Sequence, residues 1–394
     1  MKRMKKTLLC MLLIASMLTG ALLPVLAVGA AAPIAEAEKI NAAVMELPCA
    51  SAILMDAKTG NVLFEQNADA ALPPASVTKI MTLLLVMEAI EAGQLSLTDK
   101  VSVSANAASM GGSQVYLKEG ESMTVEEMLK CVIIASANDC AVALAESVAG
   151  SEEAFVARMN ARAAELGMVN TCFENTNGLD DTTTKHLTSA RDIALMSRAL
   201  IAFPKILEYS GIWMDTIRDG SFGLTNTNRL VRFYPGCTGL KTGSTARAGF
   251  CISATAERDG LSLICVIMAA KSRDERNNTA ARLLDYGFAN FSTYEAKGAQ
   301  LQVPMLGGTA AVCSLQYGSF SVTVPKGAAG RVKATVELPE ALTAPVKAGD
   351  SVGRVIYTLD GKELGSVPVF STESVDKIGF GTLFLRLLQS FLLL

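Results

Sequence analysis

Residues 73–90 read PPASVTKIMTLLLVMEAI, and they predict where a buried helix of the fold begins. The two prolines favour an extended chain, because a residue that precedes proline avoids the helical region. The apolar run from Ile80 to Ile90 then predicts a helix in a hydrophobic core. Ser76 and Lys79 are three residues apart at its start, so their side chains are expected on one face, about a turn from each other.

Ser76 and Lys79 are a candidate nucleophile and its base. A serine hydroxyl is a weak nucleophile at neutral pH and needs an adjacent base. A lysine can be that base when burial and nearby positive charge lower its pKa. A plain helix start with a solvated lysine is the alternative interpretation of these two residues.

A second polar motif, SAN at residues 136–138, separates two apolar stretches, 125–134 and 140–148, that predict helices. Polar side chains between buried helices need partners, since an unpaired buried polar group costs about 1–3 kcal/mol. We predict that Ser136 holds the lysine and relays a proton to a leaving group, and that Asn138 hydrogen-bonds a substrate amide. Helix capping by either residue is the alternative.

A third motif lies in residues 236–254, which read GCTGLKTGSTARAGFCISA and predict an edge strand with its antiparallel neighbour. The free edge of such a strand can hold an extended peptide, and a glycine in it suggests close approach of a ligand. We expect Lys241 and Thr242 to face the carboxylate of that peptide. The backbone N–H groups of Ser76 and Ser244 are expected to form an oxyanion hole.

A second KTG, at residues 58–60, lies before the serine. It stands between the short apolar runs 52–55 and 62–64, which predict two strands of a hairpin. We therefore assign this KTG no catalytic role.

The order S-x-x-K, S-x-N, K-T-G resembles the motif set of the serine-type D-Ala-D-Ala carboxypeptidases, the low-molecular-mass penicillin-binding proteins. Three further segments are similar to that family: NTNGLD at 175–180, TSARD at 188–192 and LLDYGF at 283–288. The resemblance covers roughly residues 45–290 well and the remainder loosely.

This resemblance implies an α/β fold: a β-lactamase/transpeptidase-like catalytic domain, with an antiparallel sheet between helical layers, followed by a small all-β domain. It implies release of the terminal D-Ala from peptidoglycan pentapeptide stems through an acyl-Ser76 intermediate, with β-lactams as inhibitors. No cofactor or metal is expected. The implied catalytic residues are Ser76, Lys79, Ser136 and Lys241, and the implied substrate-binding residues are Asn138, Thr242, Gly243, Ser244 and Arg276.

Two assignments within this interpretation have competitors. Arg273 is close enough to Arg276 to be the carboxylate-binding arginine instead. A class A serine β-lactamase is an alternative function, because Glu174 lies at a suitable spacing for the glutamate that activates water there. A catalytically silent peptidoglycan-binding protein is another, although it would have no need of both serines and both lysines.

The two ends of the chain predict export and membrane attachment. Residues 1–27 have a basic start and an apolar centre, as in a secretory signal peptide. Their removal takes away four positive charges and no negative ones, which moves the formal net charge from −3 to −7 and argues against nucleic-acid binding. Residues 376–394 are too short for a span of about 20 residues and predict an amphipathic helix on the outer face of the cell membrane, with partial secretion as the alternative.

The expected domains are 41–290, catalytic, and 295–370, a β-rich spacer of short strands separated by glycine and proline turns. Eight cysteines remain after residue 27, and a bridge between Cys237 and Cys251 across the strand pair is a hypothesis. The lone histidine, His186, is expected to be structural or at the rim of the site.

Overall fold

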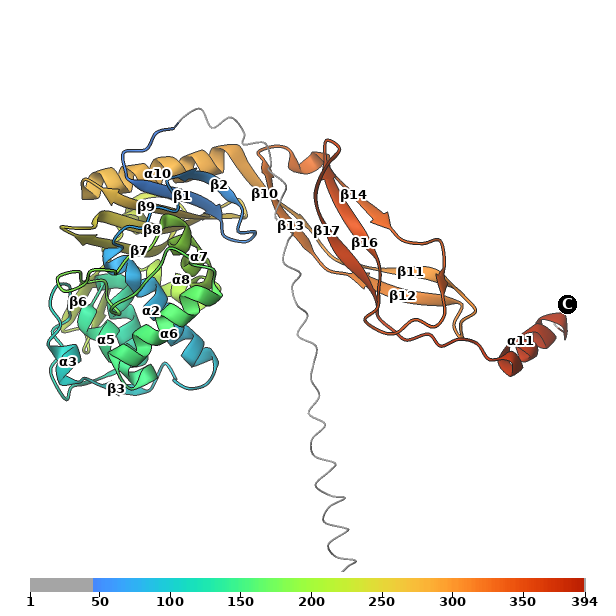
Figure 1. The fold of residues 1–394 in the computed structure, drawn as a ribbon, viewed down its shortest axis with the longest axis horizontal. Helices are drawn as coiled ribbons and strands as arrows, with labels where there is room; N and C mark the ends of the chain where they lie inside the picture. Colours follow the sequence, from blue (N-terminus) through green and yellow to red (C-terminus); the bar gives the residue numbers. More distant parts are fainter. Residues whose placement is uncertain (1–44, 393–394) are drawn as a thin grey trace, which may run out of the picture. The chain divides into compact units, whose positions relative to one another are not determined.

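The structure, a computed structural model, is described here over residues 45–392 (Figure 1). The predicted signal peptide at 1–27 lies outside the described residues, as do residues 393–394 at the end of the tail.

A five-stranded antiparallel sheet is the centre of the first part of the chain, as expected. Its strand order is β2-β1-β9-β8-β7, so β7 is an edge strand and β8 its antiparallel neighbour. This confirms the strand pair predicted for the third motif. The strands are β1 (Ser51–Asp56), β2 (Val62–Gln66), β7 (Cys237–Thr245), β8 (Gly249–Arg258) and β9 (Leu261–Ala270).

Helices cover both faces of this sheet (Figure 1). Because side chains alternate along a strand, Ile53 and Met55 pack with the buried residues of α2 (Lys79–Glu91) and α7 (Ala190–Leu200), whereas Leu54 packs with α10 (Arg273–Asn290). The resulting layers, helix–sheet–helix, bury α2 at the core of the domain.

The helix predicted around Ser76 becomes α-helical only at Lys79, three residues after the serine. A 3-10 turn, η1 (Ala75–Thr78), precedes α2 and carries Ser76, so Lys79 is the first residue of the α-helix.

The helical region between the first and third motifs carries the second motif. Thr124 starts α4 with a full capping box, in which its side chain and that of Glu127 satisfy each other's backbone N–H groups. The elements are β3 (Lys100–Ser102), α3 (Ala105–Ala108), β4 (Ser122–Thr124), α4 (Val125–Lys130), the π-helical turn η2 (Cys131–Ala135), α5 (Asn138–Ala149), α6 (Glu152–Glu165), α8 (Pro204–Ser210), β5 (Met214–Ile217), β6 (Phe222–Thr225) and α9 (Leu230–Phe233).

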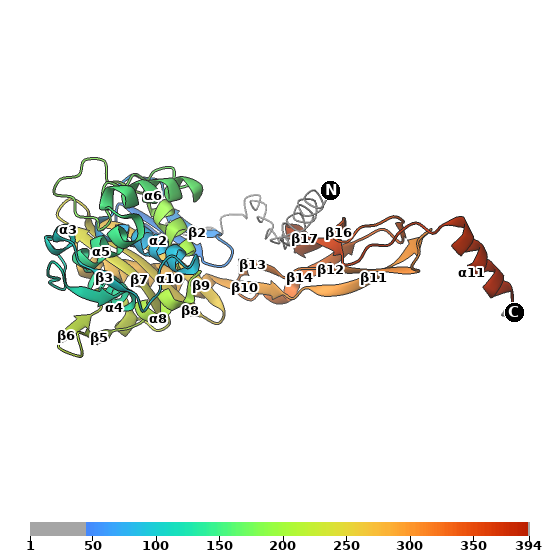
Figure 2. The same ribbon diagram turned by 90° about the horizontal axis from the view of Figure 1, so that it is seen from below.

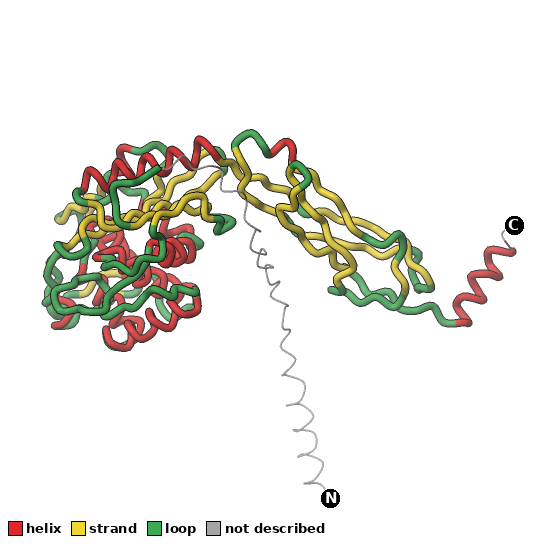
Figure 3. The backbone as a smooth tube through the Cα atoms, turned by 45° about the horizontal axis from the view of Figure 1, so that its top comes forward, coloured by secondary structure: helices red, strands yellow, loops and turns green. Residues whose placement is uncertain are grey.

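The chain after α10 is β-rich, as the glycine and proline punctuation predicted (Figure 3). A two-stranded sheet, β10-β13, and a six-stranded sheet of order β14-β16-β17-β12-β11-β15 share a small core in which Phe320 stacks on Tyr357, with ring centroids 4.1 Å apart. The elements are β10 (Phe291–Ala296), β11 (Ala299–Leu306), β12 (Val312–Tyr317), β13 (Phe320–Pro325), η3 (Ala329–Arg331), β14 (Val332–Glu337), β15 (Leu342–Thr343), β16 (Ser351–Leu359) and β17 (Lys362–Ser371).

A last helix, α11 (Phe380–Leu392), ends the described chain (Figure 2). None of its side chains is buried, and its large apolar residues are exposed. Within residues 45–392, no helix combines the length and the apolar character needed to cross a bilayer.

Candidate active site

Ser76 and Lys79 meet at the start of α2. The Nζ of Lys79 lies 2.9 Å from the Oγ of Ser76, 2.6 Å from the Oδ1 of Asn138 and 2.7 Å from the backbone oxygen of Asn177. The Oδ1 of Asn138 and the backbone oxygen of Asn177 can only accept hydrogen bonds, so each accepts one N–H of the amine. A neutral Lys79 then has its lone pair left for the hydroxyl proton of Ser76.

The environment of Lys79 favours that neutral form. Its side chain is completely buried, and burial lowers its pKa well below the usual value for lysine. The positive charge of Lys241 lowers the pKa further, while the carboxylate of Asp139 opposes both effects. The solvated lysine of the alternative interpretation is therefore wrong.

Ser136 serves the other lysine. The Nζ of Lys241 donates to the Oγ of Ser136 at 2.9 Å, whereas the side-chain partners of Lys79 are Ser76 and Asn138. The prediction that Ser136 holds Lys79 is wrong. The reason is local: Ser136 follows the π-helical turn η2 with φ 64°, a left-handed conformation that directs its side chain toward the third motif.

Asn138 is the first residue of α5 and holds Lys79. Its Oδ1 accepts from the lysine, and one N–H of its Nδ2 donates to the backbone oxygen of Gly111 at 2.7 Å. The second N–H of the amide is the group left for the predicted contact with a substrate amide.

Sequence reasoning missed a buried carboxylate behind this motif. Asp139 is fully buried and accepts hydrogen bonds from the backbone N–H groups of Val115, Leu117 and Cys140. These bonds fasten the loop before β4 to the start of α5. An acidic residue inside an apolar helix was the signal that could have identified it.

Lys241 lies on β7 with its side chain buried. Burial, followed by the positive charge of Arg276, lowers its pKa to about 7. Its neighbour Thr242 donates from Oγ1 to the Oγ1 of Thr227 at 2.8 Å, a contact that sequence reasoning also missed. Both predicted residues therefore lie on the edge strand, and Lys241 contacts Ser136 from it.

Gly243 is where β7 touches the turn of the nucleophile. A Cβ at this position would lie 2.8 Å from the backbone nitrogen of Ser76 and 2.8 Å from the oxygen of Pro74. Only glycine permits this approach without a shift of backbone. The next residue, Ser244, is exposed on the strand edge, so the two expected oxyanion N–H groups belong to segments in direct contact.

Arg276 lies in the first turn of α10 and reaches β8, the strand that pairs with the third motif. It is 3% exposed, and its guanidinium donates to the Oδ1 of Asn277 and, at 3.4 Å, to the backbone oxygen of Cys251, which pairs with Gly243 in the sheet. Burial and then the charge of Arg273 lower its pKa to about 10. Arg273 is exposed, so Arg276 is the arginine that the fold holds against the β7–β8 strand pair.

Glu174, the residue of the β-lactamase alternative, and the second KTG both lie away from the three motifs. Glu174 is exposed, and its carboxylate accepts from the backbone N–H groups of Thr184 and Lys185, so it closes a loop. Lys58 of the second KTG is half exposed in the turn between β1 and β2, as predicted, and pairs with Glu295. Neither stands among the three motifs.

The proposed disulfide is contradicted. Cys237 pairs with Ala256 and Cys251 with Gly243 along the two strands, so the two thiols stand at different positions of the sheet, and all eight described cysteines are free. Among residues 45–392 no cluster of three or more histidine, cysteine or acidic side chains could hold a metal ion.

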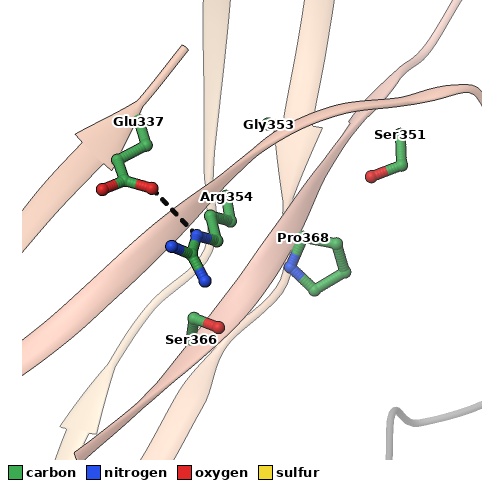
Figure 4. Close-up of a pocket in the computed structure, with 6 residues that line it drawn as sticks. All are labelled: Glu337, Ser351, Gly353, Arg354, Ser366 and Pro368. Atoms are coloured by element: carbon green, nitrogen blue, oxygen red, sulfur yellow. Dashed lines mark hydrogen bonds and ion pairs between the residues drawn. The ribbon is translucent and has the colours of Figure 1, made fainter. Parts of the chain in front are cut away.

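A separate surface pocket lies on the β-rich part (Figure 4). Its volume is about 410 Å³, and its charged groups, Glu337 and Arg354, pair with each other at 2.9 Å. The six lining residues include no lysine or histidine, and we assign the pocket no chemistry.

Comparison with known proteins gives one consistent family. The profile described as D-alanyl-D-alanine carboxypeptidase matches residues 37–272, and that of the penicillin-binding protein 5 C-terminal domain matches residues 314–377. D-alanyl-D-alanine carboxypeptidase DacF of Bacillus subtilis is 40% identical over 344 residues, which cover 85% of this chain and 88% of that protein. DacC of Escherichia coli is 38% identical over 347 residues, 83% and 84% of the two chains.

Solved structures agree with these matches. Penicillin binding protein 5 from Haemophilus influenzae superposes with a TM-score of 0.75 at 31% identity, covering 84% of this chain and 98% of that one. Penicillin-binding protein D2 from Listeria monocytogenes, in its ampicillin-bound form, covers 62% of this chain and 99% of that one with a TM-score of 0.57 and 32% identity. The expected fold class is confirmed.

Proposed function

The chain belongs to the D-alanyl-D-alanine carboxypeptidase family and is a serine-type, penicillin-binding carboxypeptidase, and we propose that Ser76 is its nucleophile. The observation that carries this assignment is the 2.9 Å contact between the Oγ of Ser76 and the Nζ of the buried Lys79. The contact gives the serine an adjacent base with a lowered pKa, and a serine hydroxyl without such a base is a weak nucleophile.

In the acylation half, the hydroxyl proton of Ser76 passes to the Nζ of Lys79 while the oxygen attacks the carbonyl of the penultimate D-Ala. Negative charge develops on that carbonyl oxygen, where the N–H groups of Ser76 and Ser244 stabilise it. The C–N bond then breaks. Ser136 gives its proton to the leaving amine and takes one from Lys241, with which it is hydrogen-bonded.

In the deacylation half, water attacks the acyl carbonyl and the same groups reset. The proton of the water passes through Ser136 to Lys241, and Lys79 returns its proton to the departing oxygen of Ser76. Each lysine therefore serves one serine in both halves of the reaction, and the protonation state of the enzyme is restored after each turnover.

Recognition of the leaving D-Ala rests on positive charge at β7. Lys241 lies on this strand with Thr242 as its neighbour, and Arg276 of α10 contacts the paired strand β8 opposite Gly243. A carboxylate bound there directs the remainder of the stem peptide along the free edge toward Ser244. Asn138 adds one amide N–H from the start of α5.

The family is one of exported cell-wall enzymes. We place this enzyme on the outer face of the cell membrane through α11, whose apolar side chains are exposed. A helix of 13 residues with one polar face is suited to lie in the interface rather than to span it.

The assignment of Ser76 is tested by D-Ala release from an acyl-Lys-D-Ala-D-Ala tripeptide, with Ser76→Ala as the paired variant. The expected result is release by the wild-type protein only, with a covalent penicillin adduct of Ser76 visible by intact mass. Release by a folded Ser76→Ala protein would overturn the assignment. Rapid turnover of penicillin by the wild-type enzyme would instead favour the β-lactamase alternative.

A further inference from the structure

His186, the lone histidine, heads a chain of hydrogen bonds that ends at the residue before the nucleophile. The backbone N–H of Glu174 donates to its Nδ1 at 2.9 Å, so the ring proton is on Nε2. Nε2 lies 2.7 Å from the Oγ1 of Thr78 and therefore donates to it. Thr78 in turn donates to the backbone oxygen of Ala75 at 2.8 Å.

This chain is buried along its whole length. His186 is 1% exposed and Thr78 is 0% exposed, and the imidazole also meets the ring of Phe173 edge-on, with centroids 5.8 Å apart. Burial lowers the pKa of His186 to about 4, so the ring is neutral at physiological pH and the direction of the three bonds does not change.

Ala75 is held in an unusual conformation. Its φ is 49°, in the left-handed region that non-glycine residues rarely adopt. Its carbonyl oxygen lies so close to Gly178 that a Cβ on that glycine would stand 1.9 Å away. Thr78 on one side and Gly178 on the other therefore fix where this carbonyl points.

The carbonyl of Ala75 and the N–H of Ser76 belong to one planar peptide group. In a trans peptide the C=O and N–H bonds point in opposite directions, so a fixed oxygen also fixes the direction of the N–H. The N–H of Ser76 is one of the two groups assigned to the oxyanion hole, and this step rests on that proposed function.

We propose that Thr78 and His186 are positioning residues that aim the N–H of Ser76 at the developing oxyanion. They touch neither the substrate nor the reacting atoms. Their effect is expected on the transition state and not on the bound substrate, because the oxyanion forms only in the reaction.

The test compares Thr78→Val, which keeps the shape of the side chain but removes the hydroxyl, with Thr78→Ser, which keeps the hydroxyl. We expect Thr78→Val to lower kcat by about 10–100-fold with KM within about twofold, less than the 10²–10³ for loss of a whole oxyanion donor. The affinity for a peptidyl boronic acid, whose tetrahedral adduct places an oxygen in the hole, should fall in parallel. Thr78→Ser should stay within about threefold of the wild type.

Thr82 provides the matched control. It lies in α2, four residues after Thr78, is also fully buried, and donates to the backbone oxygen of Thr176 at 2.5 Å. Thr82→Val makes the same chemical change and leaves both hydrogen bonds of Thr78 in place. We expect it to lower the melting temperature as Thr78→Val does, with kcat and boronic acid affinity within about threefold of the wild type.

Equal kcat in Thr78→Val and the wild type would overturn the proposal, as would an equal loss of kcat in Thr82→Val. If Thr78→Val does not fold, His186→Leu against His186→Gln makes the same comparison, because the glutamine amide can restore the donor to Thr78. Failure of the nucleophile assignment gives a different result, because the Ser76→Ala protein would then still release D-Ala.

Discussion

The Nζ of Lys241 lies 2.9 Å from the Oγ of Ser136, and the Nζ of Lys79 lies 2.9 Å from the Oγ of Ser76. Each buried lysine therefore has its own serine. The two amines influence each other through charge, since Lys241 lowers the pKa of Lys79. Loss of one lysine is expected to change the titration of the other as well as remove its own contribution.

Replacement of Lys241 by glutamine tests this coupling. Without the positive charge of Lys241 the pKa of Lys79 rises, so less of the enzyme has the neutral Lys79 that acylation needs at a given low pH. The acid limb of the pH profile therefore moves to higher pH. The profile is measured as the rate of acylation by benzylpenicillin. D-Ala release should fall by about 10²–10⁴-fold, because the leaving amine loses its proton source.

Lys58→Gln is the control, since Lys58 belongs to the other KTG and pairs with Glu295 away from the motifs. It should leave both the rates and the profile unchanged. An acid limb that stays in place in Lys241→Gln, or moves to lower pH, would show that the two lysines are not coupled as the structure indicates.

Gly243→Ala should reduce activity through the backbone. The new Cβ would meet backbone atoms of Pro74 and Ser76 at 2.8 Å, and neither can move alone, so β7 must shift from the turn of the nucleophile. A displacement of about 1 Å can cost about 10²-fold in rate, and overpacking costs about 1–3 kcal/mol in stability. Gly223→Ala, on β6 with open space around it, is the paired control for D-Ala release and should behave as wild type.

The motifs, the helix after Ser76 and the strand pair of the third motif could be predicted because each has a local signal, whereas the five-stranded sheet was implied only by the family resemblance. The prolines before Ser76, the apolar run after it and the strand pair around Lys241 were all visible in residue order, and the structure has an edge strand and a buried helix there. The pairing of Ser136 could not be predicted, because it depends on a π-helical turn and a left-handed serine that residue propensity does not indicate.

Backbone groups and strand register explain the other misses. The oxygen of Asn177 holds Lys79, but a carbonyl is present at every residue and gives no sequence signal. The bridge between Cys237 and Cys251 failed because the register between β7 and β8, including a bulge after Cys237, places them against different partners.

His186 should make the stability of the protein depend on pH. Its pKa is about 4 in the folded protein against 6.5 for an ordinary histidine, so between these values the unfolded chain binds a proton that the native protein does not. Stability therefore falls as pH falls from about 6.5 to 4, by about 3 kcal/mol in total. Urea unfolding, followed through the fluorescence of the single tryptophan, Trp213, measures this loss.

His186→Gln removes the titrating group while keeping a side chain that can donate to Thr78. Its free energy of unfolding should be less steep than that of the wild type across this window, although its value near pH 7 is lower. Parallel curves for the two proteins would mean that other groups, and not His186, carry the acid sensitivity.

The last helix is expected to bind neutral membranes through apolar burial. On α11 the polar residues Thr382, Arg386, Gln389 and Ser390 share one face, whereas Phe384 lies on the opposite face and is 55% exposed. Burial of apolar surface yields about 25 cal/mol per Å², and residues 373–394 carry equal numbers of acidic and basic side chains. Binding to zwitterionic vesicles should therefore persist at high salt, since screening acts on charge and not on apolar contact.

Two variants with the same added charge separate this mechanism from a loss of solubility or folding. Phe384→Glu places a carboxylate on the apolar face and should weaken sedimentation with phosphatidylcholine vesicles by more than about tenfold, because a charge cannot enter the hydrocarbon without a cost of several kcal/mol. Gln389→Glu adds that charge to the polar face and should bind as the wild type does. Both should release D-Ala from the soluble tripeptide at the wild-type rate. Equal binding by the two variants would rule out α11 as an amphipathic anchor, because the effect must depend on which face carries the charge.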